Sequence, residues 1–362
     1  MSITQAAVEA SLKGWIDPNL GKDLVSARMV KKIDLDGDKV AIKVMLGYPA
    51  AGFHAEMKDA LSRHVKADTG AADVNVEVGT EIVAHSVQKT LKPLPGVKNI
   101  VAVASGKGGV GKSTTSVNLA LALAAEGARV GILDADIYGP SQPLMLGLAG
   151  RPDVKEGSRL VPLVAHGVQA MSIGFLVEED QAMIWRGPMV TGALQQLLRD
   201  TAWDDLDYLI IDLPPGTGDI QLTLAQQIPV SGAVIVTTPQ DIALLDAQRG
   251  LRMFQQVSVP VLGLVENMSV HICSNCGHAE HIFGAGGGEK MAVKYGTELL
   301  GSLPLDVSIR ENADCGHPSV VADPTGKPAQ IYKEVARKMA ARLALRAKDY
   351  SARFPTITVV ND

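Results

Sequence analysis

The sequence predicts an α/β fold, in which a mainly parallel sheet lies between helices and a small α+β domain precedes it. Three observations support this prediction. Short apolar runs alternate with helical patterns from Asn99 to Lys348. A glycine-rich loop separates the first of these runs from the first helical pattern. The apolar runs are nearly continuous, as is typical of parallel strands that are buried on both faces of a sheet.

The first domain is predicted to comprise residues 1–88 and to mix helices with strands. Its predicted elements, in chain order, are helix 5–15, strands 25–34 and 39–46, helix 53–64 and strand 74–78. The dipeptide Asp36-Gly37 lies between the first two strands and is typical of a hairpin turn. Residues 89–98 contain Pro93 and Pro95, so this stretch is predicted to be a linker.

The second domain is predicted to span residues 99–348, with a tail at 349–362. Its predicted strands cover residues 100–104, 129–133, 208–211, 233–237 and 261–265, with further short strands within 152–175 and a helix at 189–198. The last helical pattern, at 330–348, has one apolar face and many basic residues. It suits either a helix packed on the sheet or a helix lying on a membrane surface. Because no Trp or Phe lies on the apolar face, we favour the packed helix.

The glycine-rich loop has the spacing of a phosphate-binding loop, which makes the predicted fold that of a P-loop NTPase. Glycines allow a tight turn whose N–H groups point at phosphate oxygens, and the following helix adds the positive end of its dipole. Lys112 supplies a charge for the β- and γ-phosphates, and the Ser113 hydroxyl can ligate Mg²⁺. We therefore expect ATP to bind at Gly106, Lys107, Gly108, Gly109, Val110, Gly111, Lys112, Ser113 and Thr114.

Three aspartates follow predicted strands at the edge where parallel sheets bind their ligands. Asp212 ends an apolar strand and is the expected carboxylate for Mg²⁺, either directly or through water. Asp134 is expected to order its loop or to support the metal, and Asp136 lies two residues beyond it. Each aspartate alone could cap a helix, but three strand-end carboxylates together indicate one site. Asn267 follows another strand, and its amide offers both a donor and an acceptor to a base edge.

Cys273 and Cys276 form a Cys-x-x-Cys pair that brings two sulfur atoms within reach of one metal ion. Three interpretations are open. The pair could form a zinc site within one chain, together with two of the histidines 271, 278 and 281. It could be a redox dithiol, although no thioredoxin-like pattern surrounds it. It could also be half of a site that the same pair from a second subunit completes, giving four thiolates for an iron–sulfur cluster or zinc. We favour the half-site.

Several motifs together resemble those of the Mrp/ApbC-type iron–sulfur cluster carrier ATPases, a deviant-Walker P-loop family. The resemblance covers about residues 95–345 and rests on KGGVGKST, DADIYGPS, WRGP, IDLPPGTGD, ENMS and the Cys-x-x-Cys segment. It implies a homodimer that binds a labile four-iron four-sulfur cluster and transfers it to apo-proteins, with slow ATP hydrolysis coupled to transfer. It also implies that Lys107 reaches the nucleotide of the other subunit, that Asp136 orients the attacking water and that Asn267 contacts the base.

The first domain resembles the small domain of iron–sulfur assembly proteins, because an Asp-Pro-Asn-Leu-Gly turn precedes two predicted strands. That family often carries a cysteine just after the second strand. The corresponding residues here, 48–53, read Tyr-Pro-Ala-Ala-Gly-Phe and contain none. A metal or thiol role for this domain is therefore not expected, and a docking role is left open. For the whole chain, the expected partners are apo iron–sulfur proteins and cluster scaffold proteins.

Composition and charge argue against several classes of function. The net charge of −5 gives no reason to expect nucleic-acid binding, and no apolar run approaches the ~20 residues that cross a bilayer. Three cysteines and no visible secretory signal favour the cytoplasm. The main alternative is a partitioning or positioning ATPase switch with a structural zinc site. A reductase that uses ATP to drive electron transfer is a second alternative, but such proteins use widely separated single cysteines.

Overall fold

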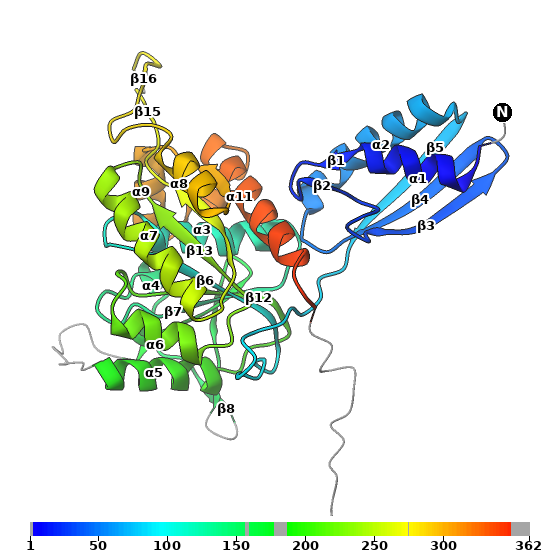
Figure 1. Ribbon diagram of the computed structural model, residues 1–362. Coiled ribbons are helices and arrows are strands. Elements are labelled where there is room, and N and C mark those ends of the chain that lie inside the picture. The colour runs from blue at the N-terminus through cyan, green and yellow to red at the C-terminus, as the bar shows by residue number, and fades with distance from the viewer. Residues whose placement is uncertain (1–2, 156–158, 177–186, 274, 349–362) are drawn as a thin grey trace, which may run out of the picture.

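A computed structural model describes residues 3–155, 159–176, 187–273 and 275–348 of the chain. Figure 1 shows a small N-terminal domain beside a larger domain built around one wide sheet. The sheet has eight strands in the order β10-β11-β7-β12-β6-β13-β14-β17. All neighbouring pairs are parallel except β10 and β11, which are antiparallel. This arrangement confirms the predicted α/β fold with a mainly parallel sheet.

The central strands of this sheet are buried, whereas the edge strands β10 and β17 are partly exposed. The eight strands are β6 (Val97–Ser105), β7 (Val130–Asp134), β10 (Leu163–Ala165), β11 (Val168–Ser172), β12 (Leu206–Asp212), β13 (Gly232–Thr237), β14 (Val261–Glu266) and β17 (Leu299–Ser302). Along β6, Val101 and Val103 pack into one hydrophobic cluster, whereas Ile100, Ala102 and Ala104 pack into a second cluster on the other face. Burial on both faces explains why the strands are apolar at successive positions rather than at alternate ones.

Helices cover both faces of the sheet. They are α3 (Lys112–Ala125), α4 (Gln142–Met145), α5 (Gly187–Asp200), α6 (Asp219–Gln227), α7 (Asp241–Gln256), α8 (Gly287–Tyr295), α9 (Val307–Asp314), α10 (Ser319–Ala322) and α11 (Lys327–Ala344). Helices α3 and α11 contribute to one hydrophobic cluster, and helices α5, α7 and α8 contribute to the other. Short pieces complete the domain: β8 (Val154–Lys155), β9 (Arg159–Leu160), η2 (Ile173–Phe175), β15 (His271–Ile272) and β16 (Ala279–Glu280).

The last helix, α11, packs on the body of the domain. Its apolar residues Tyr332, Val335 and Met339 are buried and contact α3 and the sheet. The apolar face is thus covered by protein, as the packed-helix interpretation requires. Within the described residues, the structure contains no helix that has both the length and the apolar character needed to cross a membrane.

The N-terminal domain holds a three-stranded sheet and two helices. Its elements are α1 (Gln5–Gly14), β1 (Ile16–Asp17), β2 (Lys22–Asp23), β3 (Val30–Asp36), β4 (Lys39–Leu46), η1 (Ala51–Phe53), α2 (His54–Thr69) and β5 (Asp73–Thr80). Strands β3 and β4 form the predicted antiparallel hairpin, and β5 is parallel to β4. The buried carboxylate of Asp17 accepts hydrogen bonds from the Asn19 and Leu20 N–H groups and from the Tyr48 hydroxyl, and it fixes the turn that leads into this sheet.

Several predicted boundaries differ from those of the structure. The strand predicted over residues 25–34 is wrong in its first half, because turns occupy this part of the chain and place Arg28 at a φ of 58°. Strand β6 begins at Val97, inside the predicted linker, because Val97 pairs in register with Leu206 of β12. The final helix begins at Lys327, three residues before the predicted start, and ends at Ala344. The predicted tail, residues 349–362, lies outside the described residues.

Candidate nucleotide and metal site

The glycine-rich loop joins β6 to α3, as predicted. Two of its glycines are required, Gly106 by a close backbone contact and Gly111 by its backbone conformation. A Cβ atom on Gly106 would lie 2.2 Å from the carbonyl carbon of Asp246, and one on Gly111 would lie 2.1 Å from Nδ2 of Asn267. Gly111 also has a φ of 81°, a conformation that other residues rarely adopt. The loop is therefore fixed by its neighbours as well as by its own sequence.

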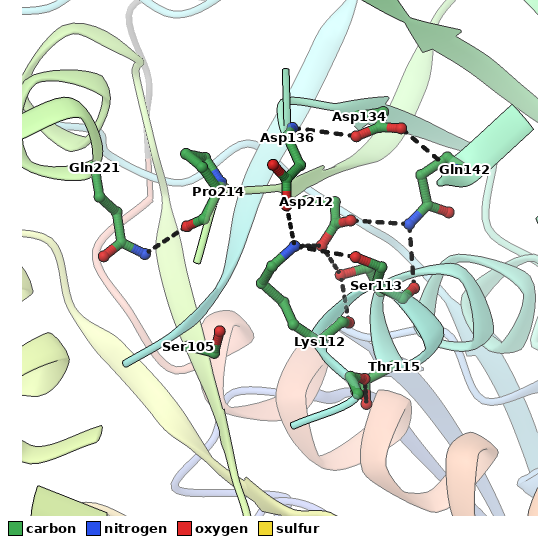
Figure 2. Close-up of polar contacts among 12 residues, drawn as sticks. Ser105, Lys112, Ser113, Thr115, Asp134, Asp136, Gln142, Asp212, Pro214 and Gln221 are labelled. Carbon is green, nitrogen blue, oxygen red and sulfur yellow. Dashed lines mark hydrogen bonds and ion pairs between the residues drawn. The ribbon is translucent and has the colours of Figure 1, made fainter. Parts of the chain in front are cut away.

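Lys112, the first residue of α3, is buried among acidic and hydroxyl groups (Figure 2). Its Nζ donates to Asp212 Oδ1 at 2.7 Å and to Ser113 Oγ at 3.1 Å, and it lies 3.9 Å from Asp136 Oδ2. The ammonium group thus neutralises carboxylates in this form of the protein. Phosphate oxygens would compete for the same positive charge.

Asp134 and Asp212 end two adjacent strands, β7 and β12, and they pair in register. Both side chains are fully buried. Asp134 accepts hydrogen bonds from the Asp136 N–H group at 3.1 Å and from the Ser172 hydroxyl at 3.1 Å. Burial, together with the nearby charge of Asp212, raises the pKa of Asp134 to about 7. Burial also raises the pKa of Asp136, although the charge of Lys112 opposes this effect. The structure therefore brings the three predicted aspartates together around Lys112.

Three residues of this cluster were not predicted from the sequence: Ser116, Gln142 and Ser172. The Ser116 hydroxyl donates to Asp212 Oδ1 at 2.8 Å, and Gln142 Nε2 donates to Asp212 Oδ2 at 3.0 Å. Ser116 lies four residues after Lys112, so helical spacing could have indicated it. Gln142 directly follows the DADIYGPS segment, but an amide at the start of a helix carries no distinctive sequence signal.

The oxygen atoms of this cluster fit a magnesium ion. Magnesium prefers carboxylate and hydroxyl oxygens and usually keeps several waters. Ser113 and Asp212 would hold it, and Asp134 would support it from the adjacent strand. Two carboxylates that are buried side by side also require a nearby cation, a role that Lys112 fills here. When bound, the ion would neutralise charge on the nucleotide phosphates.

The contacts that the structure shows for Lys107 and Asn267 do not involve the carboxylates of the cluster. Lys107 is half-buried, and its Nζ approaches Oε1 of Gln240 at 3.5 Å. Asn267 donates from Nδ2 to the Val110 carbonyl at 2.9 Å, and its Oδ1 accepts from the Met268 N–H group. Both ends of the Asn267 amide thus make hydrogen bonds to the backbone. Contact with a nucleotide base would require these two hydrogen bonds to break. The roles of both residues stay predictions.

The cysteine pair lies on a small hairpin formed by β15 and β16, which projects from the domain in Figure 1. The turn is held by hydrogen bonds from the Cys273 N–H group to the His278 carbonyl and from the Gly277 N–H group to the Cys273 carbonyl. Backbone N–H groups of Cys276 and Asn275 lower the pKa of the Cys273 thiol. A lowered pKa favours the thiolate, which is the form that binds metals.

Two of the three histidines near this hairpin, His271 and His281, have partners of their own. Nδ1 of His271 lies 3.1 Å from the Leu305 carbonyl, and Nδ1 of His281 lies 2.7 Å from the Ser269 carbonyl. His278 is exposed. In the part of the chain that the structure describes, no three Cys, His, Asp or Glu side chains form a group that could hold a metal ion. The described residues therefore do not show an assembled ligand group for a zinc site within one chain, and that interpretation stays a prediction.

Comparison with protein families gives two matches that together cover most of the chain. Residues 96–340 match the family described as NUBPL iron-transfer P-loop NTPase. Residues 5–78 match a family described as iron–sulfur cluster assembly protein. The two matches correspond to the large domain and the small domain of the fold.

Individual relatives are similar over most of their length. An iron–sulfur cluster carrier protein of Escherichia coli is 52% identical over 340 residues, covering 94% of this chain and 92% of that protein. One from Pseudomonas fragi is 64% identical over 269 residues, covering 74% of this chain and 94% of the relative. The iron–sulfur cluster transfer protein NUBPL of mouse is 52% identical over 266 residues, covering 73% and 83% of the two chains.

Among solved structures, a nucleotide-binding protein of Archaeoglobus fulgidus in complex with ADP is 39% identical. It superposes with a TM-score of 0.57 over 64% of this chain and 90% of that chain. The cell-division ATPase MinD of Pyrococcus furiosus has a TM-score of 0.52 at 23% identity, covering 66% and 97% of the two chains. At this identity the second match shows a shared fold and no more.

Proposed function

The chain belongs to the family of NUBPL iron-transfer P-loop NTPases, and we propose that it is an ATP-dependent carrier of iron–sulfur clusters. Relatives named as cluster carrier or transfer proteins support the carrier function. The resemblance noted in the sequence is thereby confirmed. The observation that carries the proposal is the presence, in one domain, of a phosphate-binding loop and a projecting Cys-x-x-Cys hairpin.

The nucleotide half of the function is hydrolysis of ATP with magnesium. Lys112 would stabilise the β- and γ-phosphates, Ser113 and Asp212 would hold the ion, and Asp136 would orient the attacking water. Asp136 suits this role because it lies at the margin of the cluster, 3.9 Å from Lys112. We propose that turnover is slow and coupled to cluster transfer, as expected when the water is oriented fully only in an assembled dimer.

The active form is proposed to be a homodimer that pairs across the face bearing Lys107. Helix α7 begins next to Gln240, the contact of Lys107, and exposes the apolar side chains of Ile242 and Leu245, which are 69% and 59% accessible. A cavity of about 550 Å³ lies on the same face, between α7 and α8. Exposed apolar side chains around a cavity are typical of a surface that binds another protein.

The cluster is proposed to bind between two subunits, with Cys273 and Cys276 of each chain as ligands. Each hairpin offers two thiols, and a four-iron four-sulfur cluster takes four. A two-fold axis brings equivalent pairs together. Because each chain would hold only half of the ligands, separation of the subunits would release the cluster to an apo-protein. Apo iron–sulfur proteins and cluster scaffold proteins are therefore the expected partners, in the cytoplasm and without nucleic acid.

Anaerobic transfer tests this function. The protein is reconstituted with iron and sulfide, separated from free reagents and mixed with an apo-enzyme that requires a four-iron cluster. We expect the wild type to restore activity of the apo-enzyme, and the double variant Cys273→Ala, Cys276→Ala to restore none. Equal activation by both proteins would overturn the proposal. The alternative, a positioning ATPase with structural zinc, shares the fold with MinD but has no support from relatives of high identity.

A further inference from the structure

Gln142, the first residue of α4, makes hydrogen bonds to three parts of the nucleotide site (Figure 2). Its backbone N–H group donates to Asp134 Oδ2 at 3.1 Å. Its side-chain Nε2 donates to Asp212 Oδ2 at 3.0 Å and to the Ser113 carbonyl at 3.1 Å. One residue thus joins the phosphate-binding loop to the ends of β7 and β12.

The two oxygens of Asp212 have different partners. Oδ1 accepts from Lys112 and from Ser116, whereas Gln142 is the partner that the structure shows for Oδ2. Nucleotide phosphates would attract Lys112 and weaken its hold on Oδ1. The amide of Gln142 would then fix the direction in which the Asp212 carboxylate points.

The acceptor end of the same amide has no partner. Gln142 is 1% exposed, and within the described residues no hydrogen bond reaches its Oε1. A buried acceptor without a donor costs about 1–3 kcal/mol, so such atoms are rare. Figure 2 shows why Oε1 lacks a donor: Nε2 faces the buried carboxylate of Asp212, and Oε1 lies on the opposite side of the amide. The amide is therefore held in this orientation by the hydrogen bonds that Nε2 donates to Asp212 and Ser113, at the expense of a partner for Oε1.

We propose that Gln142 is a positioning residue for the magnesium nucleotide. It orients Asp212 toward the ion and holds the Asp134 loop and Ser113 at fixed separations. This inference rests on the proposed function, because it assumes that Ser113 and Asp212 serve a magnesium-bound nucleotide. It predicts a specific defect in which loss of the amide weakens the contribution of magnesium to nucleotide binding and leaves metal-free binding intact.

Fluorescent mant-ADP, titrated with Mg²⁺ and separately with EDTA, distinguishes these effects. In Gln142→Met, which preserves side-chain length, we expect the gain in affinity that Mg²⁺ provides to fall by about tenfold, in the range found for residues that orient metal ligands. The affinity in EDTA should stay within about twofold of the wild type. Gln142→Glu should show the same defect, because its carboxylate places an acceptor against Asp212 Oδ2 where the amide placed a donor.

Gln88 provides a matched control. Its side-chain amide makes three hydrogen bonds, with Ala225, Ile228 and Val230, but it lies outside the nucleotide site. Gln88→Met should keep the wild-type response to Mg²⁺. The inference is overturned if the two Gln142 variants respond to Mg²⁺ as the wild type does, or if they lose affinity equally in Mg²⁺ and EDTA. A wild type that binds no mant-ADP would instead refute the proposed function.

Discussion

The carboxylate of Glu126 lies 2.7 Å from the guanidinium group of Arg337, and both side chains are largely buried. Glu126 directly follows α3, the helix that begins at Lys112, and Arg337 belongs to α11. The same carboxylate accepts a hydrogen bond at 2.8 Å from the Gly52 N–H group of the small domain. The turn at residues 48–53, where related small domains often carry a cysteine, therefore docks on the far end of the nucleotide-binding helix.

Glu126→Gln tests this contact. The substitution leaves Arg337 buried without its counter-charge, so we expect a loss of about 3–5 kcal/mol in the free energy of unfolding, measured by urea denaturation. Glu298→Gln is the control, because Glu298 pairs with Arg342 at a more exposed position. Its cost should stay below about 1 kcal/mol. Equal losses in the two variants would show that the Glu126 contact is not a buried ion pair in solution.

A pH dependence of stability follows from His85. Burial lowers the pKa of His85, whose Nδ1 donates to Asn99 Oδ1 at 2.9 Å. Below about pH 6.5 the unfolded chain takes up a proton that the folded state takes up only at lower pH. The contribution of His85 to stability is therefore full above this pH and is lost as the pH decreases from about 6.5 toward 5. His85→Gln should flatten the fall in melting temperature over this range, whereas replacement of the exposed His317 should not. If the melting temperature of His85→Gln falls with pH as steeply as that of the wild type, His85 is not the source of this pH dependence.

Lys112→Ala separates nucleotide hydrolysis from cluster binding. The ammonium group is the cation at the centre of the carboxylate cluster and the expected partner of the phosphates. We expect the hydrolysis rate to fall by about 100-fold or more, with iron content after reconstitution unchanged, because the cysteine hairpin is a separate element. Lys58→Ala, at an exposed position of α2, should keep both properties. If Lys112→Ala still hydrolyses ATP at the wild-type rate, the phosphate-binding loop is not the site of hydrolysis.

Patterns that depend on local chemistry were predictable from the sequence. The phosphate-binding loop and the cysteine pair are short local patterns, and the strand-end aspartates follow apolar runs that mark buried parallel strands. The five predicted core strands correspond to β6, β7, β12, β13 and β14 within one or two residues, except where β6 begins three residues earlier.

Features that depend on tertiary contacts were not predictable in this way. Strand β17 was missed because its four residues include Gly301 and carry little apolar signal. Gln142 and Ser172 acquire their role only when the fold places them beside Asp134. The docking of Gly52 on Glu126 joins residues 74 positions apart, and no local pattern indicates such a contact.

The central claim is that two chains share one cluster through Cys273 and Cys276. Native mass spectrometry of the anaerobically reconstituted protein tests it most directly. The account predicts a species with the mass of two chains and one four-iron four-sulfur cluster, which is absent when both cysteines are replaced by alanine. A single chain that carries one zinc ion, or a cluster that persists in the double variant, would contradict it.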